Sequence, residues 1–489
     1  MTAIPQKSNH PEWALKQKRK GTELRLINDH YYLYEVTSKW NPDKKRAQKI
    51  TGKLLGRVTP EGFIESDKQK LRDTITQLAA VPVYTKEYGA SHFVVTHFND
   101  YTVCLRDYFP DIWREIMTLA FIRLVYQSPI KNIQFRYENS YLSERYSDLS
   151  LTDKKVSSLF RQIGSERAQT VSFMQTFIRG GDYILIDGTP LISHSKHIDL
   201  VKPGYNSQQL FASQLNLMFL FSTKLKLPVY YRILPGNIRE VKAFKLTLEE
   251  SGLTDAVIIS DKGFFSQANV DCLETERLNY IIPLRRNSTL INYEPIEQPR
   301  KTGFDHYFCY HNRFIWHYTI DYPRRKVVVF FDEQLKVREI SDYLKRIETH
   351  PESYQLANFK EKESSLGTLA VLNNLQEKTP EAIYHYYKSR DNIEIMFDAM
   401  KNILEADASY MQNELALQGW MFINHIALQW YYQIYQLLTQ KGLGSKYSVI
   451  DILSHLAEIR KVKINGNWKT AEINAKTVAV LEKLGIPIT

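Results

Sequence analysis

The chain has 489 residues, of which 43% are hydrophobic and 24% are charged, and this length indicates two to four folded units rather than one. Its 64 Lys and Arg residues outnumber its 54 Asp and Glu residues, and the formal charge of +10 is compatible with a polyanionic partner such as nucleic acid. The composition excludes collagen-like and low-complexity proteins.

A basic, β-rich module is predicted at the N-terminus, over residues 1–65. Two alternating segments, 24–40 and 45–58, are joined by the turn sequence NPDKK, as is typical of paired strands. Aromatic and basic side chains are interleaved in it: Tyr31, Tyr32, Tyr34, Lys39, Trp40, Lys44, Lys45, Arg46, Lys49, Lys53 and Arg57. This mixture suits phosphate binding and base stacking, but it is equally typical of a solvated hairpin, and both interpretations stay open.

The next segment, 66–180, is predicted to be mostly helical. Residues 111–126 are amphipathic at helical spacing, and residues 151–164 begin at a plausible capping position. Short helices of this kind suit either a helix-turn-helix element or a plain helical bundle, and periodicity does not separate the two.

An α/β domain is predicted to begin after Gly180 and Gly181, with its first part over 181–284. Short apolar segments alternate there with helical ones, which favours a core with a mixed sheet. The expected strands are 183–187, 213–222, 227–234, 256–260 and 280–284, and the expected helices are 241–251 and 266–277.

A β-rich insertion is predicted to interrupt this domain over residues 285–365. The segment HYFCYHNRFIWHYTI alternates, and KVVVFFD is typical of a buried strand. Asp332 follows that strand and is expected to cap a helix over 333–348. Trp316 lies on an alternating strand with other aromatic residues, so core packing is favoured for it over a role in holding a flipped base.

The α/β domain is predicted to resume over 366–440 and to be followed by a helical C-terminal region, 441–489. Thr379 is expected to cap a helix that has Pro380 in its first turn. The apolar segment 419–438 contains Asn, His and Gln residues, which indicates a buried core helix rather than a membrane span.

Neither export nor membrane insertion is expected from the sequence. The first twenty residues contain no apolar segment, and no stretch reaches about 18 uninterrupted apolar residues. Cys104, Cys272 and Cys309 lie far apart, which supports neither a disulfide framework nor a zinc ribbon and favours a reducing cytoplasm.

Acidic residues follow two of the expected strands. Asp187 comes directly after YILI, and Asp261 comes after AVIIS, and each is close to a glycine that lets other groups approach the backbone. Carboxylates at strand ends point into the crevice where ligands of α/β sheets bind. Taken singly, each of these aspartates is more often a turn residue or a helix cap.

A third acidic residue lies in YYKSRDNIEIMFDAMK, residues 386–401, which we expect to be one helix. At about 100° per residue, Tyr387, Arg390, Glu394 and Lys401 fall within about 60° of arc and share a face. An i,i+4 pair such as Arg390 and Glu394 is common on solvated helices and by itself indicates no function.

Convergence of Asp187, Asp261 and Glu394 would be strongly repulsive unless cations bind between them. Mg²⁺ or Mn²⁺ suits such an all-oxygen set of ligands. Two such ions, about 3.5 to 4 Å apart, can support an in-line displacement at phosphorus, so phosphodiester hydrolysis or transesterification is the expected reaction.

The sequence also resembles a known family. The spacing Tyr-x2-Arg-x3-Glu-x6-Lys, together with IDGT at Asp187, PVYYRILPGN, and VIISDKGFFSQANVDCL followed by YIIPLRRN at Asp261, is similar to the signature of bacterial insertion-sequence transposases. These are DDE transposases with a Tyr-Arg-Glu-Lys motif. The resemblance covers roughly residues 180–440 and shows no departure at the acidic triad.

The resemblance implies an RNase H-like catalytic core with a β-rich insertion, in which Asp187, Asp261 and Glu394 hold two divalent metal ions. It further implies that Tyr387, Arg390 and Lys401 hold the phosphates of the transposon end. The expected protein is a metal-dependent transposase that binds terminal inverted repeats, cleaves DNA, and joins the ends to target DNA.

Its partners would be transposon ends and target DNA, bound by at least a dimer, with the helical segment 66–180 contacting the ends. We expect it in the bacterial cytoplasm, associated with the nucleoid when DNA-bound, and not at a membrane. Two alternatives stay open from the sequence. One is a related RNase H-like nuclease or resolvase, and the other is a domesticated DNA-binding protein without catalysis.

Overall fold

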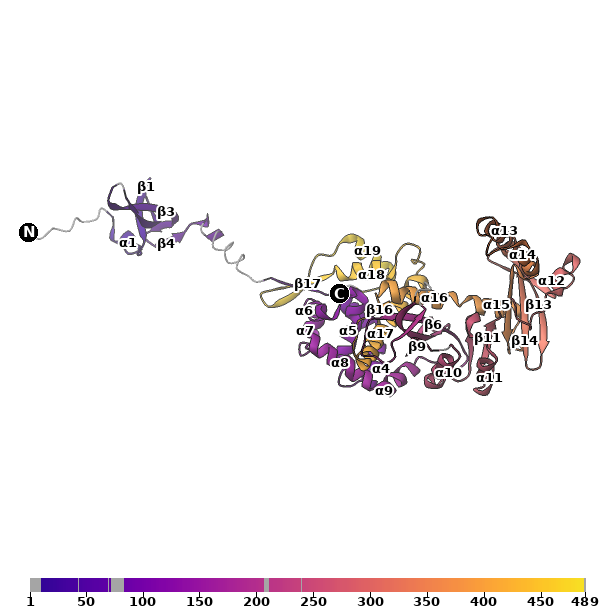
Figure 1. Ribbon diagram of the computed structural model, residues 1–489. Coiled ribbons are helices and arrows are strands. Elements are labelled where there is room, and N and C mark those ends of the chain that lie inside the picture. The colour runs from indigo at the N-terminus through magenta and orange to yellow at the C-terminus, as the bar shows by residue number, and fades with distance from the viewer. Residues whose placement is uncertain are drawn as a thin grey trace, which may run out of the picture. The chain divides into compact units, whose positions relative to one another are not determined.

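The computed structural model describes residues 10–42, 44–68, 70–71, 83–205, 211–238 and 240–487 (Figure 1). Residues 1–9 of the predicted N-terminal module and 72–82 of the predicted helical segment lie outside the described residues. The chain divides into two compact units, of which the first comprises 1–85 with 462–469 and the second comprises 86–461 with 470–489.

The N-terminal unit is a four-stranded antiparallel sheet with one short helix. Its elements are α1 (Glu12–Leu15), β1 (Thr22–Ile27), β2 (His30–Asn41), β3 (Arg46–Thr59) and β4 (Gly62–Glu65), and the strand order is β1–β2–β3–β4. Asn28 and Asp29 both have positive φ, which makes the tight two-residue turn between β1 and β2. A small core of Ala14, Leu24, Leu33 and Val58 holds the sheet and the helix together.

In the second unit, a group of helices surrounds one long buried helix, α17 (Glu414–Gln440) (Figure 1). The others are α3 (Gly89–His97), α4 (Asn99–Tyr108), α5 (Trp113–Tyr126), α6 (Ile133–Glu138), α7 (Leu142–Arg145), α8 (Asp153–Ser165) and α9 (Arg167–Gln175). The prediction that 419–438 forms a buried core helix is confirmed, because Asn424, His425 and Gln429 are buried within α17.

Two glycines let α8 and α17 approach each other closely. A Cβ added to Gly164 would lie 1.9 Å from the carbonyl oxygen of Leu415, and one added to Gly419 would lie 2.1 Å from that of Phe160. Because the obstructing atoms are backbone, neither position has room for a side chain. The two helices therefore pack at a distance that only glycine allows.

The central sheet of the second unit is mixed. Strands β6 (Asp182–Ser193), β8 (Phe211–Ser222) and β9 (Leu227–Pro235) pair antiparallel with one another, whereas β10 (Ala256–Ile259) and β11 (Asn279–Pro283) run parallel to β6. The resulting order is β11–β10–β6–β8–β9, with α10 (Glu240–Ser251) and α11 (Gln267–Thr275) in the connections. This is the RNase H-like α/β core that the sequence predicts.

The insertion extends this sheet instead of forming a separate one. Strands β12 (His306–Tyr310), β13 (Arg313–Tyr322) and β14 (Arg325–Asp332) form an antiparallel meander, and β15 (Thr368–Asn373) joins β14 to β11. Its helices are α12 (Glu294–Glu297), α13 (Glu333–Thr349) and α14 (Leu356–Lys362). Asp332 caps α13 as predicted, with its carboxylate accepting a hydrogen bond from the amide of Leu335.

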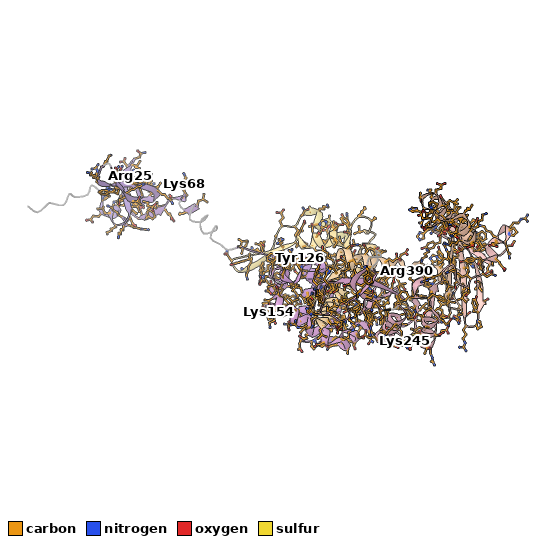
Figure 2. All side chains as sticks on the ribbon, viewed as in Figure 1. Arg25, Lys68, Tyr126, Lys154, Lys245 and Arg390 are labelled. Carbon is orange, nitrogen blue, oxygen red and sulfur yellow. The ribbon has the colours of Figure 1, made fainter. Side chains whose placement is uncertain are left out.

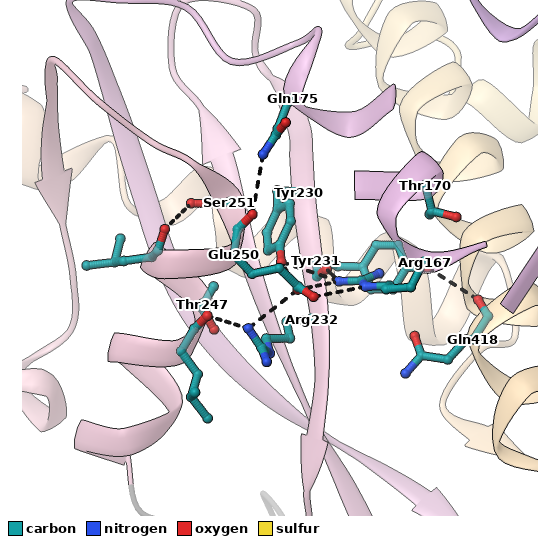
Figure 3. Close-up of polar contacts among 12 residues, drawn as sticks. Arg167, Thr170, Gln175, Tyr230, Tyr231, Arg232, Thr247, Glu250, Ser251 and Gln418 are labelled. Carbon is teal, nitrogen blue, oxygen red and sulfur yellow. Dashed lines mark hydrogen bonds and ion pairs between the residues drawn. The ribbon is translucent and has the colours of Figure 1, made fainter. Parts of the chain in front are cut away.

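A network of polar contacts joins the helical part to the sheet (Figure 3). Arg167 of α9 donates to Glu250 of α10 at 2.7 Å and to the backbone carbonyl of Tyr231 in β9 at 3.1 Å. Arg232 approaches the same carboxylate at 3.5 Å, and the hydroxyl of Tyr230 donates to it. Because these groups are largely shielded from water, the contacts fix α9 and α10 against one edge of the core.

The C-terminal region departs from the helical prediction for 441–489. It contains α18 (Val449–Ala457) and α19 (Ala475–Leu484), but β17 (Arg460–Ile464) and β18 (Asn467–Thr470) lie between them. Asn465 and Gly466, both with positive φ, form the hairpin turn, a signal that the sequence carries in the dipeptide Asn-Gly. These strands belong to a small sheet with the order β18–β17–β5, where β5 is Tyr84–Glu87.

Two further short strands, β7 (Lys202–Tyr205) and β16 (Ala408–Ser409), pair with β8 and β6 and have no counterpart in the sequence prediction. Among the helices of the described residues, none is long and apolar enough to cross a membrane.

Candidate active site

Asp187 lies in the middle of β6 and not at the end of a strand. The prediction that this strand ends at residue 187 is wrong, because β6 continues to Ser193 and pairs with β8 as far as Ile192. On its other edge, however, pairing with β10 stops at Leu185. Asp187 therefore lies just beyond the end of β10, where that edge of β6 becomes accessible.

Asp261 follows β10 by two residues and stands at the start of a single 3-10 turn, Lys262–Phe264. Its backbone is still extended, with φ −80° and ψ 164°. Because β6 and β10 are parallel and in register from Asp182 and Ala256, they carry Asp187 and Asp261 to the same end of the sheet. Parallel pairing thus brings two carboxylates together that lie far apart in sequence.

The stretch 386–401 is not one continuous helix, which corrects the prediction. Helix α15 (Pro380–Lys388) begins at Thr379, whose side chain accepts from the amide of Ala382 as expected. It stops at Ser389, whose hydroxyl donates to the carbonyl of Tyr386 at 2.6 Å and competes with the helical pattern. Helix α16 (Asp391–Asp398) follows, and a π-helical turn over Ala399–Ile403 ends the segment.

The three acidic residues converge on one guanidinium, that of Arg390, which lies at the junction of α15 and α16. Arg390 is labelled among the side chains in Figure 2. Its nitrogens are 3.3 Å from Asp187, 3.6 Å from Asp261 and 3.0 Å from Glu394. The side chains of Arg390 and Asp187 are only 16% and 17% exposed, whereas that of Glu394 is 57% exposed. Three elements therefore place their carboxylates around a single shielded cation.

Burial controls the electrostatics of this cluster. It raises the pKa of the Asp187 carboxyl to about 6, although Arg390 opposes the shift, and the neighbouring charge of Asp261 adds to it. Burial tends to lower the pKa of Arg390, but Asp261 and Asp187 outweigh it and raise that pKa. The pKa of Tyr387 is raised mainly by burial, against the effect of Arg390. Asp187 is thus the carboxylate whose ionisation most needs a nearby cation.

The other two residues of the motif differ in position. Tyr387 lies beside Arg390 and lines a cavity of about 630 Å³. Lys401 is in the π-helical turn, where burial lowers its pKa and Asp407 is the charge that opposes this shift. Among the described residues, no hydrogen bond or ion pair joins Lys401 to Asp187, Asp261 or Glu394. The prediction that Lys401 shares a face with Tyr387, Arg390 and Glu394 assumed one regular α-helix. The break between α15 and α16 and the π-helical turn change the rotation per residue, so that assumption does not hold.

The cavity beside Tyr387 contains cations that the sequence analysis did not assign. Lys262 and Arg285 are exposed on its wall, and Arg286 is held there by hydrogen bonds to the carbonyl of Thr368 and to Glu339. Each lies in the loop that follows a strand of the core, Lys262 after β10 and the two arginines after β11. Their signal in the sequence is a basic residue adjacent to Asp261 and the pair Arg-Arg after an apolar strand.

Residues 179–430, which are more than half of the chain, match the family described as "Transposase DDE domain". The chain belongs to this transposase family. No curated protein matches the sequence.

Among solved structures, the fold is similar to that of the piggyBac transposase in a synaptic complex with hairpin DNA. The identity is 11% and the TM-score 0.41, over 71% of this chain and 70% of that one. It is also similar to the Mos1 transposase in a paired-end complex with the left transposon end. There the identity is 13% and the TM-score 0.15, over 31% of this chain and 53% of that one.

The acidic residues of this DDE transposase have the donor chemistry of a divalent metal site. Within the described part of the chain, no three His, Cys, Asp or Glu side chains are grouped closely enough to hold a metal ion. Asp187 and Asp261 nevertheless lie at the same end of the sheet and offer the carboxylate oxygens that Mg²⁺ and Mn²⁺ prefer. The residues therefore fit such an ion, provided that the guanidinium of Arg390 moves from between them.

Proposed function

We propose that this protein is a DNA transposase that binds the terminal inverted repeats of an insertion sequence and catalyses metal-dependent strand cleavage and strand transfer. The observation that supports it best is the convergence of Asp187, Asp261 and Glu394 on Arg390, within a chain of the transposase DDE family. Carboxylates brought together from separate elements are the ligands with which two-metal sites hold their ions for phosphoryl transfer.

In this proposal, Asp187, Asp261 and Glu394 hold two divalent ions, Mg²⁺ or Mn²⁺. When bound, such ions activate the attacking oxygen and stabilise the leaving oxygen. In cleavage, a water oxygen bonds to phosphorus while the bond to the 3′-oxygen breaks, and that oxygen leaves as a 3′-hydroxyl. In strand transfer, the 3′-hydroxyl attacks a target phosphodiester, so one P–O bond forms as another breaks.

Tyr387, Arg390 and Lys401 are proposed to hold the phosphates of the transposon end. Arg390 binds carboxylates in the absence of DNA, and it can turn to a phosphate once divalent ions neutralise Asp187 and Asp261, since a guanidinium binds both groups with the same fork. Exposed Lys262 and Arg285, on the cavity beside Tyr387, are suited to bind the adjoining phosphates of the same strand.

Glu394→Gln tests the assignment because it removes a ligand charge with little change in volume, at a side chain that is 57% exposed. We expect Mg²⁺-dependent cleavage of a plasmid carrying the element's two ends to be lost, while end binding and the melting temperature are kept. Glu381→Gln is the matched control, since this glutamate lies on α15 and is 54% exposed. Cleavage by the Glu394 variant at the wild-type rate would contradict the proposal.

The same assay separates the alternatives. A related nuclease or resolvase would cut the plasmid but would not join the freed 3′-ends to a second DNA molecule. A domesticated DNA-binding protein would show no cleavage that depends on Asp187. A transposase that cuts both ends together is expected to bind them as at least a dimer, which mass measurement of the protein–DNA complex would show.

A further inference from the structure

The N-terminal unit contains a two-stranded ribbon that extends beyond its sheet. Strand β1 pairs with β2 only as far as Glu35, and β4 pairs with β3 only as far as Gly56. From Val36 paired with Thr51 to Asn41 paired with Arg46, strands β2 and β3 pair with no other strand of the described residues, although at the base the amide of Val36 also donates to the carbonyl of Gly21. We call residues 36–51 the β2–β3 ribbon. Register shifts at Tyr34 mark its base, where irregular pairing increases the local twist.

The β2–β3 ribbon is strongly basic. Its sequence contains five cations, Lys39, Lys44, Lys45, Arg46 and Lys49, and one acidic residue, Asp43, which lies outside the described residues. Lys49 is paired with Glu23 at 2.9 Å. Within the described part of the chain, the other four cations form no ion pair. Side chains with positive charge and no acidic partner attract a polyanion.

The ribbon also carries a tryptophan whose side chain is exposed and does not belong to the small core of the N-terminal unit. Trp40 is 63% exposed, and Ile50 on the opposite strand is 44% exposed. Pairing of Trp40 with Ala47 and of Ser38 with Lys49 places these four on one face, whereas Lys39 and Arg46 lie on the other. A tryptophan exposed among basic side chains can make the aromatic contact that accompanies phosphate binding on nucleic-acid-binding surfaces.

We propose that the β2–β3 ribbon binds in a groove of duplex DNA with its Trp40 face toward the groove floor, where Trp40 makes an apolar contact. Lys39 and Arg46 on the outward face, and Lys45 in the turn, then reach the backbone phosphates at the rim of the groove. The inference rests on the proposed function and extends it by naming an element that holds the DNA. The major groove admits a two-stranded ribbon of this width. Single-strand platforms stack successive bases on several rings, but the ribbon has a single aromatic residue, so duplex DNA fits better.

The test uses the full-length protein and a short duplex of arbitrary sequence, titrated over a range of salt concentrations. For Lys39→Ala/Arg46→Ala, we expect the slope of log affinity against log salt to fall by about two, at roughly 0.9 for each phosphate. Affinity near 0.1 M salt should fall roughly 10- to 100-fold. Trp40→Ala should weaken binding with an unchanged slope. An unchanged melting temperature would show that the variants fold.

The matched control is Lys245→Ala/Lys483→Ala, which removes two exposed lysines from the other unit and should keep the wild-type slope. A wild-type slope for the ribbon variant would overturn the inference, as would an equal loss of affinity for a single strand of the same length. Failure of the ribbon is distinguishable from failure of the proposed function. If only the inference about the ribbon is wrong, the ribbon variants bind and cleave DNA normally, and Glu394→Gln still abolishes cleavage.

Discussion

Replacing Arg390 by alanine should destabilise the metal-free protein and make it more responsive to divalent ions. The contact with Asp187, at 3.3 Å between side chains only 16% and 17% exposed, is of the kind that contributes about 1.5–3 kcal/mol. The contacts with Asp261 and Glu394 involve carboxylates that are 34% and 57% exposed, so they add only about 0–1 kcal/mol each. The expected loss of unfolding free energy is therefore about 1.5–5 kcal/mol.

The assay is thermal unfolding in buffer with chelator, repeated with added Mn²⁺. Removing the guanidinium leaves carboxylates that repel one another, and a divalent ion then relieves this repulsion without displacing Arg390. The rise in melting temperature on adding Mn²⁺ should accordingly be larger for Arg390→Ala than for wild type. Arg390→Lys should fall in between, because an ammonium lacks the fork that reaches several carboxylates.

Arg346→Ala is the matched control for this experiment. Arg346 also forms an ion pair, at 2.8 Å with Asp342, but the two side chains are 50% and 62% exposed. Its removal should cost no more than about 0.5 kcal/mol. If Arg390→Ala melts like wild type in chelator and responds to Mn²⁺ to the same extent, then Arg390 does not hold the carboxylates together and the reasoning is refuted.

Other predictions follow from single sites. Burial raises the pKa of Glu87 from 4.5 to about 7, so its stabilising contribution is present below pH 4.5 and is lost as the pH rises through 7. This amounts to about 3 kcal/mol, and Glu87→Gln should flatten the pH dependence of unfolding measured in urea. Gly419→Ala should cost several kcal/mol, because the new methyl meets backbone of α8 at 2.1 Å, whereas Gly444→Ala, with nothing within 4 Å, should be neutral in the same assay. Arg285→Ala should reduce the salt slope of end binding by about one without changing the melting temperature, and an unchanged slope would remove Arg285 from the DNA path. Lys401→Ala should do the same, and an unchanged slope would remove Lys401 from the residues proposed to hold the phosphates of the end.

The sequence by itself determined much of the architecture. Short apolar segments located β8, β9, β10 and β11, because strands in the middle of a covered sheet are buried along most of their length. The capping residues Thr379 and Asp332 were identified correctly, because a cap is a local interaction between a side chain and an amide a few residues away. Spacing and neighbouring motifs also placed the chain in its family.

Predictions from local sequence patterns were wrong where strand pairing set the length of a strand, and where a side chain competed with the backbone hydrogen bonds of a helix. The apolar run before Asp187 gave no sign that β6 continues to Ser193, because the continuation depends on β8 lying alongside it. The helix over 386–401 has good periodicity, yet Ser389 bonds back to Tyr386 and interrupts it. The helical prediction for 441–489 did not use the dipeptide Asn465-Gly466, which is a hairpin signal in the sequence and forms the turn between β17 and β18.

Only the tertiary structure decided what lies between the carboxylates. The sequence predicts that three acids converge and that divalent metal ions relieve their repulsion, and it pairs Arg390 only with Glu394, four positions away on the same helix. In the folded chain, the register of β6 with β10 and the break between α15 and α16 bring Arg390 within 3.6 Å or less of all three. The distances from Arg390 to Asp187 and Asp261 depend on how separate elements pack. Because these residues lie more than a hundred positions apart, no local sequence pattern indicates that they meet.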